Sequence, residues 1–114
     1  MLESVTTAAL QSALDGLSLR QKTIADNVAN INTPNYRAQK VQFEDALAKS
    51  IDEGNGAATA TTKRSLEPTN TNGNNVNLDE ETLSNVDTVL RYQFATQAMN
   101  SELTSVRAAM RTNS

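Results

Sequence analysis

Acidic residues are the side chains of this sequence whose types and spacing come closest to catalytic chemistry. They occur as neighbours in three places: Glu44-Asp45, Asp52-Glu53 and Asp79-Glu80-Glu81. Two carboxyl groups do general acid–base work when they converge in a dry cleft that pushes their pKa values apart. These clusters fall on predicted helix ends and solvated faces, where runs of charge usually cap helices or face water. We therefore predict no catalytic residues and a protein that is not an enzyme.

The composition excludes several other kinds of site. The chain has no Cys and no His, so the common zinc, haem and iron–sulfur sites have no ligands. We predict no metal site and no cofactor. The net charge of −3 and the interspersed charges argue against nucleic-acid binding, which needs a basic face. No apolar run is longer than Ala8-Ala9-Leu10, so we predict no secretory signal peptide and no direct membrane insertion.

The supply of core side chains is small. Leu, Ile, Val and Phe together make up 23 of the 114 residues, and Ala, which fills little core volume, is the commonest apolar residue. This fraction lies at the edge below which chains tend to be disordered. We therefore predict a single domain over residues 1–114 whose core is poor unless something else completes it.

Residues 1–31 are predicted to form one long N-terminal helix. Gln21 fills the polar slot in its apolar series, and Gly16 is a weak point that costs about 1 kcal/mol relative to Ala. The series follows steps of three and four residues, which is typical of a coiled-coil seam. Its members are Leu10, Leu14, Leu17, Ile24, Val28 and Ile31.

Residues 32–52 are predicted to form a turn and a short element. Pro34 ends the helix because it lacks an amide hydrogen and pushes Thr33 out of the helical region. Asn35, at the third position of the turn, tolerates a positive φ. After the turn the pattern is ambiguous, since Val41 and Phe43 alternate as in a strand. We favour a short helix from about residue 43 to 52, on the helical spacing of its apolar residues.

Residues 53–75 are predicted to form a flexible loop. Leu66 is its only large apolar residue, and Gly, Thr and Asn make up much of the rest. Such a stretch buries too little surface to offset the entropy cost of ordering it.

Residues 77–111 are predicted to form a second long helix, with Asn77 or Asp79 as its N-cap. One apolar seam steps along it without a break: Val89, Tyr92, Thr96, Met99, Leu103, Val106 and Met110. A second stripe lies beside the seam and consists of Leu83, Val86, Leu90 and Phe94. We therefore predict an all-α fold in which two long terminal helices pair as a coiled-coil-like hairpin.

The two stripes of the C-terminal helix exceed what a single helix pair can bury. Apolar stripes at helical spacing usually form only the core of such a hairpin. Because two helices alone make a marginal fold, we favour a partner chain as the surface that covers the second stripe.

The most specific stretch of the sequence surrounds the turn at Pro34. Asn27 and Asn30 lie one turn apart at the end of the first helix. Their amides are placed to close the last helical carbonyls or to reach the following turn, and Tyr36 is placed to fold back on the helix end. The alternative is a helix stop with polar side chains of no further significance.

The pattern Asn27-x-x-Asn30-x-x-Thr33-Pro34-x-Tyr36 resembles the signature of the bacterial flagellar rod and hook family, the axial proteins of the basal body. Members usually carry Gly at the position of Asn35, and Asn is the best substitute at positive φ. A second match runs from Gly73 through Glu81 and continues at Leu90-Arg91-Tyr92-Gln93.

This resemblance implies a structural subunit of the proximal rod, the drive shaft for motility, whose terminal helices pack as an inner tube domain. The implied partners are further copies of the chain, other rod subunits, and motor-ring and export-gate proteins at the rod base. It also implies a periplasmic rod location, reached through the flagellar type III channel without a cleaved signal. Phe43-x-x-x-Leu47 resembles an export-gate recognition motif, with an ordinary apolar helix pair as the alternative. Another short rod subunit, or a soluble helical adaptor or secretion chaperone, stays open.

Overall fold

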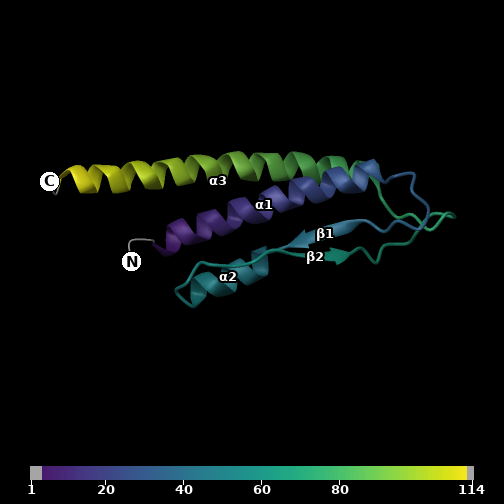
Figure 1. Ribbon diagram of the computed structural model, residues 1–114, viewed down its shortest axis with the longest axis horizontal. Helices are drawn as coiled ribbons and strands as arrows, with labels where there is room; N and C mark the ends of the chain where they lie inside the picture. Colours follow the sequence, from purple (N-terminus) through teal and green to yellow (C-terminus); the bar gives the residue numbers. More distant parts are fainter. Residues whose placement is uncertain (1–3, 113–114) are drawn as a thin grey trace.

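The structure is a computed structural model that describes residues 4–112. Its elements are, in chain order, α1 (Val5–Ala29), β1 (Gln39–Gln42), α2 (Glu44–Asp52), β2 (Thr61–Arg64) and α3 (Leu78–Thr112). α1 and α3 run side by side in opposite directions, and α1 lies between α3 and the strand pair (Figure 1). The molecule is long and thin, with extents of 66 × 25 × 15 Å. The described part of the chain has no helix long and apolar enough to cross a membrane.

The fold is mostly helical, as predicted, but the all-α description left out a small sheet. β1 and β2 pair antiparallel, with Val41 opposite Thr62. The alternation of Val41 and Phe43 marked β1, whereas β2 carries no such signal because all four of its residues are exposed. The short middle helix is confirmed, and β2 lies inside the stretch 53–75, where the sequence predicted no strand.

The first helix begins and ends with local capping bonds. The Ser4 side chain accepts a hydrogen bond from the Thr7 backbone N–H at 3.0 Å, so Ser4 is the N-cap. The helix ends at Ala29, two residues before the predicted Ile31, and turns lead from there to Pro34. The predicted start at residues 1–3 lies outside the described residues.

The hydrophobic core centres on one small cluster between α1, β1 and α3. The cluster consists of Leu17, Val41, Phe43 and Ala95, and three more apolar residues are buried outside it, namely Ile24, Ala38 and Val76. Gly16 makes this packing possible, since a Cβ atom at that position would lie 2.5 Å from Cδ1 of Phe43. Gly16 is therefore the contact through which Phe43 reaches α1, a role that helix propensity alone did not reveal.

The third helix presents two different faces. Glu81, Thr88 and Ala95 are buried on the face toward α1. The second stripe lies on the opposite side and stays exposed: Leu83 at 71 %, Val86 at 54 %, Leu90 at 61 % and Phe94 at 76 %. α3 also extends past the start of α1 (Figure 1). The last members of the predicted seam are therefore exposed as well, namely Leu103, Val106 and Met110.

Candidate functional site

The predicted signature residues lie at the closed end of the helix pair, which we define as residues 26–38 and 65–81. Asn27 is fully buried at its centre. Its Nδ2 donates to the carbonyl of Gln39 at 2.8 Å and to Oε1 of Glu81 at 2.9 Å. Its Oδ1 accepts from the Gln39 N–H at 2.9 Å and from the Tyr36 hydroxyl at 3.2 Å. One amide thus ties together α1, the turn, β1 and α3.

The bonds of Asn27 to Gln39 also cover one edge of the sheet. An amide that donates to a backbone carbonyl and accepts from the N–H of the same residue takes the place of a neighbouring strand. Arg20 extends this cover, because its Nη2 donates to the Val41 carbonyl at 2.8 Å. Two side chains of α1 therefore satisfy both outward backbone groups of Gln39 and the outward carbonyl of Val41.

The rest of the signature forms a local turn. Asn30 donates from Nδ2 to the Asp26 carbonyl at 2.8 Å, and its Oδ1 accepts from the Thr33 hydroxyl at 3.0 Å. Asn35 has φ 63, which confirms the predicted left-handed position. Pro34 is exposed beside it. Asn27 and Tyr36 thus meet each other, while Asn30 and Thr33 meet on the neighbouring turn.

Two further asparagines complete the closed end and were missed as functional residues. Nδ2 of Asn74 donates to the carbonyls of Asn30 and Thr33, each at 2.8 Å. Asn75 accepts from the Ala38 N–H at 2.6 Å and donates to the Ser65 carbonyl at 3.2 Å. Their low hydrophobicity made them look like loop residues. The sequence offered one signal for these two residues, namely two adjacent amide side chains directly before an apolar residue and the start of a helix.

Glu81 is a buried carboxyl group within this network. It is 7 % exposed, and burial raises its pKa above the usual 4.5, against the opposing effects of the Asn27 hydrogen bond and the Lys40 charge. Since the folded state favours the protonated form, ionisation costs stability as pH rises from 4.5 through the higher folded-state pKa.

We expect Glu81→Gln to unfold at a higher temperature than the parent at neutral pH. The neutral amide retains an acceptor for Asn27 and avoids the buried charge. The gain should disappear below pH 4.5, where the parent carboxyl is protonated in both the folded and unfolded states. Thermal unfolding across this pH range measures it, with exposed Glu53→Gln as control. An equal gain at acid pH would contradict the assignment.

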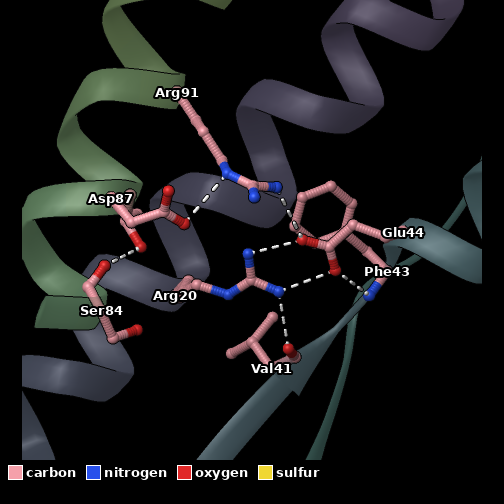
Figure 2. Close-up of polar contacts among 8 residues, drawn as sticks. Arg20, Val41, Phe43, Glu44, Ser84, Asp87 and Arg91 are labelled. Atoms are coloured by element: carbon pink, nitrogen blue, oxygen red, sulfur yellow. Dashed lines mark hydrogen bonds and ion pairs between the residues drawn. The ribbon is translucent and has the colours of Figure 1, made fainter. Parts of the chain in front are cut away.

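An ion-pair cluster joins the start of α2 to both long helices (Figure 2). The Arg20 guanidinium donates to both carboxylate oxygens of Glu44 at 2.7 and 2.8 Å, and its Cζ lies 4.9 Å from the centre of the Phe43 ring. Nη1 of Arg91 lies 3.8 Å from Oε2 of Glu44, and Nε of Arg91 lies 3.0 Å from Oδ2 of Asp87. The hydrogen bond from Arg20 holds the pKa of Glu44 below its usual value.

The two arginines of this cluster should differ in their effect on stability. The side chain of Arg20 is 16 % exposed and that of Arg91 is 55 % exposed. Arg20→Ala also leaves the Val41 carbonyl without its partner, so we expect a loss of about 1–2 kcal/mol. Arg91→Ala should cost less than about 0.5 kcal/mol. Urea unfolding of the two variants tests this difference, and equal losses would show that the cluster does not anchor the sheet.

The remaining predicted site residues are spread over the two long helices and α2. Within the subunit Leu17 and Ile24 are fully buried. Six other seam residues are half-buried, namely Leu10, Leu14, Ile31, Val89, Tyr92 and Met99. Val28 is exposed. Phe43 is buried in the core, and Leu47 is partly buried against it.

Two of the three acidic clusters contain a carboxylate that is bonded within the subunit. Glu44 is paired with Arg20, and Glu81 is paired with Asn27. Among residues 4–112 no group of acidic side chains is placed to hold a metal ion, and every buried side-chain nitrogen or oxygen has a hydrogen-bond partner. The geometry is that of a helix pair with a hydrogen-bonded polar end and an exposed apolar face.

Comparison with known proteins identifies the family. A family model described as "Flagella basal body rod protein" matches residues 8–37, most of α1 and the signature turn. The flagellar basal body rod protein FlgB of Bacillus subtilis is 30 % identical, covering 96 % of this chain and 95 % of the relative. Those of Borreliella burgdorferi and Escherichia coli are each 29 % identical, covering 86 % and 82 % of this chain and 90 % and 83 % of the relatives. The chain belongs to the flagellar basal body rod protein family.

Within that family the chain is similar to the FlgB proteins. This favours a FlgB-like rod component over the other short rod subunit and over a soluble adaptor. The prediction of a structural rod component that assembles with other basal-body subunits is confirmed at this level.

Proposed function

We propose that the outward face of α3 is the surface through which this rod subunit packs against its neighbours in the proximal rod. The single observation that supports it is the exposed stripe on the side of α3 turned away from α1: Leu83, Val86, Leu90 and Phe94. Fully burying one such side chain contributes about 1.5–3 kcal/mol, and a contiguous exposed apolar patch usually marks an interface. A helix that is apolar on two faces requires a cover on both.

The C-terminal turns of α3 supply a second contact of the same kind. Leu103, Val106 and Met110 continue the series of the face that packs on α1, and they are exposed in the subunit. A coiled-coil-like seam that one subunit leaves incomplete is completed when a neighbouring helix packs on it. We place a second rod subunit there, either another copy or a different member of the rod.

The signature turn has a different role in this proposal. Asn27 and Asn74 direct their amides into the subunit, and each has all its polar atoms bonded within the chain. We infer that the signature sets the alignment of α1 and α3, and so the position of the outward stripe, rather than contacting a neighbour itself.

Export of the chain through the flagellar type III channel follows from the same proposal. Seven hydrophobic residues among residues 4–112 are buried, and four of them form the core cluster, which is consistent with a free subunit of low stability. Phe43 is 6 % exposed in the fold, so recognition of the Phe43–Leu47 pair by the export gate requires the chain before it folds. The subunit would then fold as it joins the rod in the periplasmic space, next to the motor ring and export gate.

Deletion and complementation test this function. Loss of the gene should abolish rod, hook and filament, and the restored chain should be present in purified basal bodies. A soluble adaptor or secretion chaperone predicts instead a stable cytoplasmic complex and none of the chain in basal bodies. Complete motile flagella in the deletion strain would refute the proposal.

A further inference from the structure

We propose that the free edge of β2 binds an extended acidic segment of another polypeptide by strand addition. This surface goes beyond the helical packing proposed above, because it lies on the sheet and not on α3. It can therefore be tested without assembling a rod.

The register of the sheet identifies which backbone groups are free. The Ser65 N–H donates to the Ala38 carbonyl at 2.7 Å, so Ala38 and Ser65 form a hydrogen-bonded pair. Lys40 and Lys63 are the pair two positions further along the same ladder. Hydrogen-bonded and non-bonded pairs alternate along an antiparallel ladder. The backbone groups of Thr62 and Arg64 therefore point away from β1. The same alternation explains why Gln39, which lies opposite Arg64, turns its N–H and carbonyl away from β2 and toward Asn27.

The two edges of the sheet differ in whether other side chains cover them. The edge of β1 is covered by Asn27 and Arg20, whereas all four residues of β2 are exposed. No hydrogen bond from elsewhere in residues 4–112 reaches the backbone of Thr62 or Arg64. β2 lies at the outer margin of the molecule, on the side of β1 away from α1 (Figure 1). An uncovered strand edge is a template for another strand.

The charges of the sheet indicate the occupant. Lys40 lies directly opposite Lys63, Arg64 follows, and neither strand carries an acidic residue. Lys40 interacts with Glu81 of α3, so Lys63 is the charge of this pair that a strand at the free edge would meet. Like charges opposite each other are destabilising, and a neighbouring strand with Asp or Glu beside Lys63 would relieve them. Pairing with the β2 edge of a second copy would instead add like charges to the same place. We therefore commit to an acidic segment of a different polypeptide.

Binding of a labelled short peptide, alternating Thr and Glu, to the full chain tests the proposal by fluorescence anisotropy. Thr62→Pro removes an outward N–H without a hydrogen bond to β1, so the fold should persist while affinity falls by about tenfold or more. Thr62→Val keeps the N–H and should bind like the parent. Lys63→Glu should lower the affinity for the acidic peptide and raise the affinity for a matched peptide that has Lys in place of Glu.

Several results would overturn this proposal. They are an absence of binding to the parent, equal binding by Thr62→Pro when its circular dichroism is unchanged, and equal affinity for the acidic and basic peptides. Self-association of the chain that Thr62→Pro abolishes would show that the occupant is a second copy instead. None of these results tests the packing of α3, so the proposal that α3 packs against neighbouring rod subunits is tested separately.

Discussion

Asn27→Ala is expected to lower the free energy of unfolding by about 3 kcal/mol or more. The substitution leaves the N–H and carbonyl of Gln39, the Glu81 carboxyl and the Tyr36 hydroxyl without their shared partner. Each buried polar group left unpaired costs about 1–3 kcal/mol. Since the free subunit has a small core, this loss should leave the variant largely unfolded under conditions in which the parent is folded.

Urea unfolding followed by circular dichroism measures the effect. Asn30→Ala is the matched control, because the Asn30 side chain bonds to the Asp26 carbonyl and the Thr33 hydroxyl and does not reach β1 or α3 in these bonds. We expect it to cost about 1 kcal/mol. Similar losses for the two variants would contradict the central position assigned to Asn27.

The double substitution Leu90→Glu with Phe94→Glu should abolish rod assembly while leaving the free subunit as stable as the parent. Both side chains are exposed in the subunit, at 61 % and 76 %. Surface changes of this kind usually alter stability by no more than about 0.5 kcal/mol. In an assembled rod the same positions would bury two charges without partners, which costs several kcal/mol in each subunit and is repeated along the structure.

Motility, basal-body electron microscopy and the unfolding curve of the purified chain together test this prediction. Ala48→Glu introduces a charge on the exposed side of α2, away from both apolar surfaces, and should preserve motility. Normal rods from the double variant would rule out the outward stripe as an interface. A large loss of subunit stability would show instead that the stripe is part of the fold.

The helical part of this fold was accessible from the sequence because helix signals are local. The spacing of Leu17 and Ile24 and the stop at Pro34 lie within a few turns of one another. The second stripe of α3 was likewise predicted as more apolar surface than one helix pair needs, and its four residues are exposed in the subunit. These local signals do not indicate which element or chain packs against each face of a helix.

The parts that the sequence did not reveal depend on contacts between distant residues. β2 has no inward apolar residue, and its place is set by β1 and by bonds such as Asn75 to Ser65. Gly16 has meaning only once Phe43 packs on it, 27 positions along the chain. Asn74 and Asn75 bond to backbone groups of segments far from them in sequence, and the pair of amides does not by itself show which groups these are.

The structure connects these features in one physical account. Buried amides at the closed end align α1 and α3, and the sheet is fixed to α1 by Asn27 and by the hydrogen bond of Arg20 to the Val41 carbonyl. The small core leaves most of the apolar surface of α3 outside the subunit. In the packing proposed above, neighbouring rod subunits would cover this surface.

Site-specific photo-crosslinking in intact basal bodies tests the central claim most directly. A photoreactive residue at Leu90, on the exposed stripe, should give abundant covalent products with a neighbouring rod subunit. The same residue at Ala48, on the exposed side of α2, serves as the control and should give far fewer products between chains. If Leu90 yields no product between chains while subunits crosslinked elsewhere are recovered from the same rods, the outward face of α3 is not the packing surface.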